Sequence, residues 1–277
     1  NPAAAANAAI GKVGQLMGEV MAKGADGVER PLKEGDAVYK GDVLSTKKGG
    51  LVKLAFPDGT SFQLGEGAQA ILDKFIYNPE AKQGGFEATV TKGIFSFQSG
   101  AISGLNAGRH STIKTPTAVI GIRGSELSGE VTDDGSTTVV HTSGILDISD
   151  ATGQGTVTLI EPNTATQVVF GAGAPAPVFK APDTFINRLN GQLDIEKAKE
   201  ERGNDNNQEN QNNQGNDTTQ QGDKPQAKAE DANSNKEAPA ADAAAQGEEG
   251  INEDPAEEAS AETQDAAKEP EGIDESP

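Results

Sequence analysis

Only two histidines occur in the 277 residues, His110 and His141, and neither lies in a recognisable catalytic motif. His110 follows Arg109 in a glycine-rich stretch, and His141 ends a β-prone run. A serine or cysteine nucleophile needs a base held beside it, yet no Gly-x-Ser-x-Gly elbow is present. The Walker loop, the dinucleotide fingerprint and the His-Glu-x-x-His motif are absent as well. We therefore expect no enzymatic activity and no cofactor.

Arg123 is the third side chain that could bind a ligand, after Arg109 and His110. It lies in an otherwise apolar run, and a buried guanidinium needs a partner. Glu126 or a distant aspartate could supply that partner. An ion pair that locks the register of a strand is our first interpretation, and ligand binding is the alternative.

The carboxylates Asp133, Asp134, Asp147 and Asp150 could touch a calcium ion, but they lack the spacing of an EF-hand. We interpret them as solvated turn residues and expect no metal site. A hydrolase that uses paired carboxylates remains an alternative, because aspartate and glutamate are common. Aromatic residues make up only 4% of the chain, which weighs against a cleft that stacks on sugars.

The elements that must position these residues are short β-strands. Two β-prone runs flank Asp58-Gly59, and a second Asp-Gly pair at 134–135 precedes the run 137–141, so both sites predict hairpins. Further strand candidates are 86–91, 93–97, 118–122, 145–148, 156–160 and 167–170. This spacing of about 8–12 residues favours an all-β fold, either solenoid-like or a sandwich of many short strands.

The chain changes character after residue 170. Residues 171–182 are rich in Pro, Ala and Gly and are expected to form an extended linker. Asp183 offers an N-cap, and an apolar stripe at helical spacing follows, made of Phe185, Ile186, Leu189 and Leu193. The pattern predicts an amphipathic helix over 183–202, which we expect to dock on the β-domain. Partner binding by this helix is the alternative.

Residues 203–277 form a strongly acidic tail. They hold 20 Asp and Glu against 4 Lys and Arg, a net charge of -16 out of -20 for the whole chain. They contain no aromatic residue, so the buried apolar surface cannot offset the entropy of ordering the backbone, and disorder is expected. Such a tail excludes nucleic acid as a natural partner. It acts either as a solubilising spacer or as a weak, salt-dependent interaction segment.

The first residues suggest an exported protein. The chain begins Asn1-Pro2-Ala3 without methionine, as expected for a mature product after removal of a signal peptide, although trimming would give the same start. Residues 1–9 are a small-residue stub that we expect to lack order. No run of about 18 apolar residues exists, so we expect no membrane span. Cysteine is absent. We expect the protein in the bacterial periplasm or at the cell surface.

Three stretches occur in the order and spacing of a known family. They are 32–46 (LKEGDAVYKGDVLST), 56–64 (FPDGTSFQL) and 115–127 (TPTAVIGIRGSEL). With a later strand start at 144–146, they resemble the FecR-domain family over residues 10–150. The first stretch is also similar to N-terminal retention modules of large bacterial adhesins. We therefore assign 10–170 as a FecR-like β-domain.

The resemblance implies a module that works outside the cytoplasm without catalysis. The family's namesakes join a cytoplasmic anti-sigma segment, a transmembrane helix and a periplasmic β-domain that receives a signal. For this chain it implies binding of a protein or a cell-envelope component. The alternatives are a self-associating structural subunit of a surface or matrix assembly, and a polysaccharide-active enzyme.

Most motif residues have structural interpretations. The pairs Gly35-Asp36 and Gly41-Asp42 are typical of turns in which the aspartate caps backbone N–H groups. Pro116 fixes φ before a strand. The complete set of expected structural residues is Gly35, Asp36, Gly41, Asp42, Asp58, Gly59, Pro116, Gly121, Arg123 and Gly124.

Overall fold

The computed structural model of the chain describes residues 8–105 and 110–202. These residues confirm the all-β prediction, since 15 strands form one continuous sheet. Residues 1–7 of the predicted stub, Arg109 and the predicted disordered tail lie outside the described residues. No helix of the described part is long and apolar enough to cross a membrane.

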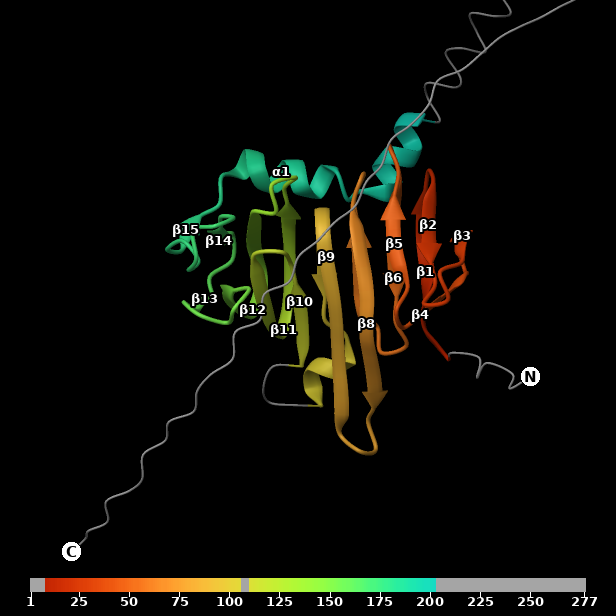
Figure 1. The fold of residues 1–277 in the computed structure, drawn as a ribbon, viewed down its shortest axis with the longest axis horizontal. Coiled ribbons are helices and arrows are strands. Elements are labelled where there is room, and N and C mark those ends of the chain that lie inside the picture. The colour runs from red at the N-terminus through yellow and green to blue at the C-terminus, as the bar shows by residue number, and fades with distance from the viewer. Residues whose placement is uncertain (1–7, 106–109, 203–277) are drawn as a thin grey trace, which may run out of the picture. The chain divides into compact units, whose positions relative to one another are not determined.

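The strands follow one another along the length of the domain, and a helix crosses their ends (Figure 1). Their bounds are β1 Ala9–Met17, β2 Val20–Lys23, β3 Glu29–Pro31, β4 Ala37–Tyr39, β5 Val43–Thr46, β6 Leu51–Ala55, β7 Ser61–Leu64, β8 Gln69–Asn78, β9 Gln83–Gln98, β10 Ser111–Lys114, β11 Ala118–Val131, β12 Thr137–Asp150, β13 Val157–Leu159, β14 Thr164–Val168 and β15 Phe179–Lys180. The helices are the 3-10 helix η1 Ala101–Gly104 and α1 Asp183–Gly191.

The long strand β9 organises the sheet because its two halves pair with different neighbours. Its first half lies between β8 and β10. It pairs with β8 in the antiparallel and with β10 in the parallel direction. Its second half lies between β7 and β11, both antiparallel. Gly93 separates the halves with φ +91°, a conformation that side chains of L-residues rarely adopt. The strand therefore bends at Gly93 and exchanges partners there.

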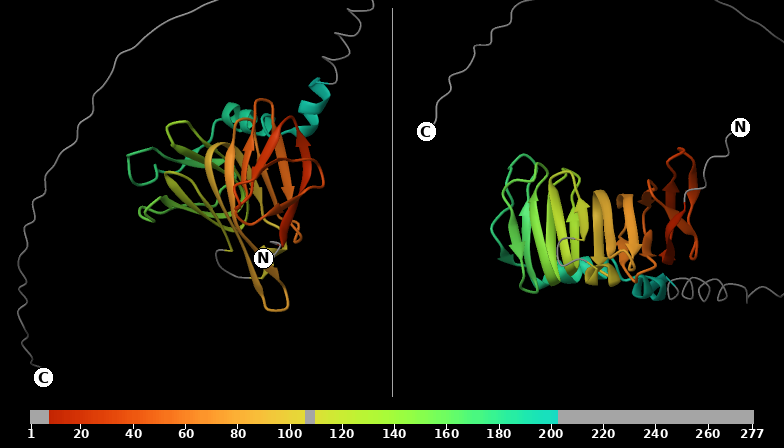
Figure 2. Two further views of the ribbon diagram at one scale, coloured as in Figure 1. Left: turned by 45° about the vertical axis from the view of Figure 1, so that its right-hand side comes forward. Right: turned by 90° about the horizontal axis from the view of Figure 1, so that it is seen from below.

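Strands β11 and β12 bend in the same way, so the sheet divides into two rows. Row A runs through β4, β1, β6, β7, the second halves of β9 and β11, the first half of β12, β14 and β15. Row B runs through β3, β2, β5, β8, the first halves of β9 and β11 with β10 between them, the second half of β12 and β13. Figure 2 shows both rows extending along the domain.

The two rows face each other across one core. Phe62 of row A lies 5.6 Å, between ring centroids, from Phe86 of row B. Phe86 is also 4.9 Å from Phe97, which belongs to the other half of the same strand. All three rings are buried, and the surrounding side chains are mainly Val, Ile and Leu. The architecture is therefore sandwich-like, with three bent strands joining its layers.

Several predicted strands are parts of longer ones. The candidates 86–91 and 93–97 are the two halves of β9, and 145–148 continues the run 137–141 within β12. The separation was wrong because Gly93, and Gly144 in β12, take positive φ within the strands without ending the pairing. Both predicted hairpins are present, as β6–β7 at Asp58-Gly59 and as β11–β12 at the second Asp-Gly pair.

The segment after β14 is held against the sheet. Ala176 N–H donates to Gln167 O at 2.8 Å, and β15 pairs with β14. The predicted single helix is interrupted: α1 ends at Gly191, and residues 195–202 are helical again. Pro182, not Asp183, is the N-cap of α1. Asp194 caps the second segment, because its Oδ1 accepts from Lys197 N–H at 3.0 Å.

Gly93→Ala tests the bend in β9. An added Cβ would lie 2.5 Å from Ala68 Cα, so the substitution adds overpacking of about 1–3 kcal/mol to the strain of positive φ. Gly59→Ala is the matched control, because Gly59 has φ +86° and nothing within 4 Å of an added Cβ. We expect only the strain there, about 1–2 kcal/mol. Urea unfolding measures the loss of unfolding free energy in both variants. Equal losses would contradict the conclusion that the close packing of Ala68 requires glycine at position 93.

Candidate functional site

Residues 183–202, here called the C-terminal strap, cross the ends of the strands (Figure 1). The predicted stripe faces the sheet: Leu189 is fully buried and Leu193 nearly so. They pack with Ile94 of β9 and Val140 of β12. The strap thus closes a second, smaller apolar cluster at this side of the domain.

Polar contacts fix the strap along its length. Near its start, Arg188 forms an ion pair with Glu130 at the end of β11. Near its end, Lys199 Nζ lies 2.8 Å from Glu34 Oε1, and Arg202 donates to Gly49 O at 3.0 Å. Because Glu34 and Gly49 lie near the N-terminal strands, the strap spans the domain from β15 to that side.

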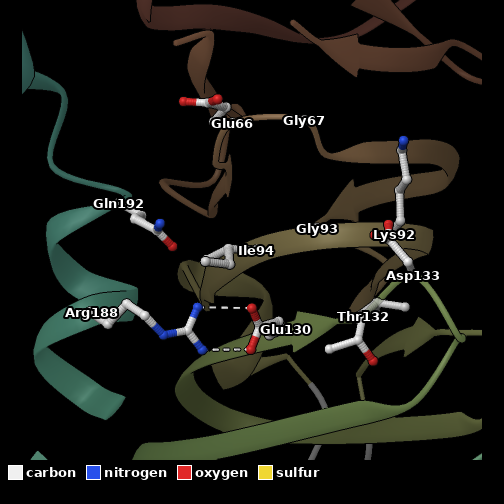
Figure 3. A pocket seen from close by; sticks show the side chains of 11 residues that line it. Glu66, Gly67, Lys92, Gly93, Ile94, Glu130, Thr132, Asp133, Arg188 and Gln192 are labelled. Carbon is white, nitrogen blue, oxygen red and sulfur yellow. Dashed lines mark hydrogen bonds and ion pairs between the residues drawn. The ribbon is translucent and has the colours of Figure 1, made fainter. Parts of the chain in front are cut away.

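A groove of about 520 Å³ lies between the strap and the strand ends (Figure 3). Its walls come from the β7–β8 loop, the bend of β9, the β11–β12 hairpin and α1. The lining residues are Glu66, Gly67, Lys92, Gly93, Ile94, Glu130, Val131, Thr132, Asp133, Arg188 and Gln192. The bend at Gly93 places the side chains of its two neighbours in this groove.

The charges of the groove are only partly neutralised. Arg188 donates two hydrogen bonds to Glu130, at 2.8 and 2.6 Å, and its guanidinium lies 4.9 Å from the ring centroid of Phe185. This bidentate bond raises the pKa of Arg188. No ion pair is found within the described ranges for Glu66, Lys92 or Asp133. The groove therefore keeps two carboxylates and one ammonium group for a ligand.

Catalysis has little support from the groove. Its only hydroxyl, on Thr132, donates within the hairpin to Asp134 Oδ1 at 2.6 Å or to Ser136 O at 3.0 Å. No described set of three or more His, Asp and Glu residues is arranged to hold a metal ion. The arrangement suits recognition of a charged group.

His110 lies away from this groove and is bound on both ring nitrogens. Gly124 N–H donates to Nε2 at 2.7 Å, so the ring proton sits on Nδ1 and is shared with Ser111 Oγ at 2.8 Å. This tautomer cannot take a proton from Ser111, which removes the one adjacent Ser–His pair from nucleophilic chemistry. Burial lowers the pKa of His110, and the charge of Asp58 opposes that shift.

Arg123 is paired with a distant aspartate, one of the two partners that the sequence suggested. Its guanidinium lies 3.0 Å from Asp147 Oδ2 on the neighbouring strand β12. The side chain is 38% exposed, so it is less buried than expected. Its Nε is buried and has no hydrogen-bond partner in the described part of the chain. Arg109, the remaining candidate, lies outside the described residues.

The turn aspartates accept backbone hydrogen bonds. Asp36 accepts from Lys33 N–H at 2.8 Å, and buried Asp42 accepts from Tyr39 N–H at 2.9 Å while pairing with Arg30. Asp58 accepts from the N–H groups of Thr60 and Ile102. Each turn contains a glycine of positive φ, respectively Gly35, Gly41 and Gly59.

Pro116, Gly121 and Gly124 belong to β11 and its approach. Pro116 contacts the β11–β12 turn, where a Cβ on Gly135 would lie 3.3 Å from its ring. Gly121 pairs with Thr112 on one side and Asp147 on the other. Gly124, with φ +61°, sits at the bend of β11.

One family model matches the middle of the chain. Residues 42–146 match the family described as FecR protein, which confirms the predicted resemblance over that segment. The match begins within the first of the three motif stretches. A comparison with curated proteins finds no match.

The solved structures that match are distant. Two crystal structures of a candidate anti-sigma factor from Parabacteroides distasonis have TM-scores of 0.40 and 0.41, with 14% identity over 52% of this chain and 62% of that chain. The chain thus spans about three fifths of those relatives. A cell surface anchoring domain is 37% identical over 22% of this chain and 82% of its own length, with a TM-score of 0.22.

The buried His110 predicts a pH dependence. Its folded pKa lies below the ordinary value of 6.5, so the folded state binds fewer protons there than the unfolded state. The contribution to stability is full above pH 6.5 and is lost as pH falls through the folded pKa. Urea unfolding between neutral and acidic pH should show a steeper loss for the wild type than for His110→Gln, by up to about 1.4 kcal/mol per pH unit. Parallel profiles would contradict this role.

The strap is held mainly by apolar burial. Leu189→Ala should cost about 2–5 kcal/mol of unfolding free energy, since it leaves a cavity. Glu130→Gln should cost under about 1 kcal/mol, because the Arg188 side chain is 41% exposed and solvent screens the pair. Equilibrium unfolding in urea gives the free energy of unfolding of both variants. A larger loss for Glu130→Gln than for Leu189→Ala would show that the ion pair, and not apolar burial, mainly holds the strap.

Proposed function

We propose that the protein is a non-catalytic FecR-like module that acts outside the cytoplasm, in the periplasm or at the cell surface, and binds a protein or cell-envelope component. The FecR match over 42–146 supports a regulatory module of this type. The groove beside the C-terminal strap is the proposed binding site. The observation that carries this choice is that Glu66, Lys92 and Asp133 have no ion-pair partner in the described part of the chain although they line one groove of about 520 Å³.

The charges of the groove favour a basic protein segment as the ligand. Glu66 and Asp133 have no cationic partner in the described part of the chain, whereas Glu130 is neutralised by Arg188. A lysine or arginine side chain entering the groove would pair with these carboxylates. The side-chain amide of Gln192 supplies further donors and an acceptor for the peptide backbone.

The groove also has an apolar floor. Ile94 is 7% exposed and belongs to the apolar cluster under the strap. A rim of charged groups around an apolar floor is typical of protein-recognition surfaces. A ligand segment that combines a basic residue with an apolar one therefore matches the groove.

Charge reversal in the groove tests the proposal. Isothermal titration calorimetry measures the binding of a short peptide that contains lysine, arginine and leucine to the full chain. We expect Asp133→Lys to raise the dissociation constant by about 10-fold, since it replaces an attraction with a repulsion.

Glu80→Lys is the control, because it changes the net charge equally at the exposed β8–β9 turn. The acidic tail is identical in both variants, so any peptide that it binds contributes equally to the two titrations. An equal loss of peptide affinity in the two variants would mean that net charge, and not the groove, attracts the peptide, and the proposed site would be abandoned.

A further inference from the structure

The C-terminal end of the sheet carries most of the large hydrophobic side chains that are exposed in the described residues. Seven large hydrophobic side chains are exposed in the described residues, and five of them lie between residues 160 and 179. These five are Ile160, Val169, Phe170, Val178 and Phe179. They belong to the segment 151–180, here called the end face, which contains the outermost strands β13 and β15 of the two rows. Apolar gatherings of this kind mark interaction surfaces.

The end face offers a hollow as well as projecting side chains. A cavity of about 160 Å³ opens beside Phe170, which is itself 66% exposed. Pro116, Ala151 and Val168 contribute to its apolar lining, and Asp150 adds one carboxylate, which bonds within its own turn to Thr152 and Gln154. A surface with both an exposed ring and an apolar hollow can be complementary to a copy of itself, as an isologous contact requires.

Backbone pairing is not the means of contact. Pro175 and Pro177 interrupt the outer segment, and β15 has only two residues. Proline lacks the N–H that a strand ladder needs. A partner would therefore contact this face through side chains, and not by adding a strand.

Charge on the end face favours a second copy. Residues 151–180 contain one acidic residue, Glu161, and one basic residue, Lys180, so their net charge is zero although the whole chain carries -20. Two such faces can meet without net electrostatic repulsion. With two-fold symmetry, Glu161 of each copy faces a surface that also bears a lysine.

The strap places the attachment point of the acidic segment far from this face. It begins next to β15 and ends at Arg202, which bonds to Gly49 between β5 and β6. Residues 203–277, with their net charge of -16, are thus attached toward the N-terminal strands. Two copies that meet at their end faces have these attachment points on the outer sides of the pair.

From these observations we propose that the protein forms a two-fold symmetric dimer through the end face. Of its 30 residues 22 are exposed, within the roughly 20–30 residues that each partner contributes to an interface of standard size. The opposite end differs: β3 carries Glu29, Arg30 and Pro31, residues that protect an edge. The contact therefore joins like ends and does not extend into a fibre. None of the groove residues named above belongs to 151–180, so dimerisation and groove binding can fail independently.

Sedimentation velocity of the full chain over a concentration series tests the proposal. We expect a monomer–dimer equilibrium, and a monomer at every concentration would overturn it. Ile160→Glu should raise the dimer dissociation constant by at least about 10-fold, because it places an unpaired charge in an apolar contact. Val28→Glu is the matched control: Val28 is 61% exposed and Ile160 62%, but Val28 lies at the other end. Equal weakening by both would refute the end face.

Single cysteines test the symmetry, because the natural chain has none. Phe179→Cys should form an intermolecular disulfide on mild oxidation, whereas Val28→Cys should not. A mixture of the two variants that forms mainly the mixed disulfide would indicate head-to-tail contact and would overturn the symmetric dimer.

Discussion

The bend of β9 at Gly93 is the constraint on which the rest of the structure depends. One strand supplies the centre of both rows, so the two layers cannot form independently. Ala68 lies so close that only glycine fits at the bend. The same bend places Lys92 and Ile94 in the groove. The fold and the proposed site therefore share one backbone feature, and the groove cannot be altered there without affecting both layers.

Strand β11 also bends and changes partners, and here side chains hold the bend by hydrogen bonds. His110 accepts from Gly124 N–H, and Ser125 Oγ lies 2.8 Å from both the N–H and the O of Ile145 across the strands. Arg123, next to this bend, pairs with Asp147. Two of the three side chains singled out as ligand candidates thus lie where a strand changes partners. His110 and Ser125 supply partners for backbone groups at the bend, where the ladder is interrupted.

Local features of the fold could be predicted from sequence, and long-range ones could not. Asp-Gly pairs define both hairpins because the turn chemistry is contained in a few residues. The alternation of apolar residues breaks at Lys92 and resumes one residue out of phase after Gly93, and such a break is the same whether one strand bends or two strands meet. The FecR motifs indicated the module type. The groove joins residues of four separate segments, such as Glu66 and Arg188, and no local pattern relates them. Arg188 lies three residues after Phe185 on the predicted helix, the only hint that a charge stands beside the apolar stripe.

The distribution of charge follows from the path of the strap. If the chain left the sheet directly after β15, the acidic segment would begin beside the one large neutral, apolar surface. Instead, residues 183–202 lead the chain across the strand ends. Leu189 holds them by packing in the apolar cluster, and Arg202 by its hydrogen bond to Gly49 O. Electrostatic repulsion between exposed charges is largely screened beyond about 8 Å at physiological ionic strength. Attachment at the far strands therefore keeps the start of the acidic segment away from the end face, and the strap accomplishes this with the same residues that close the apolar cluster.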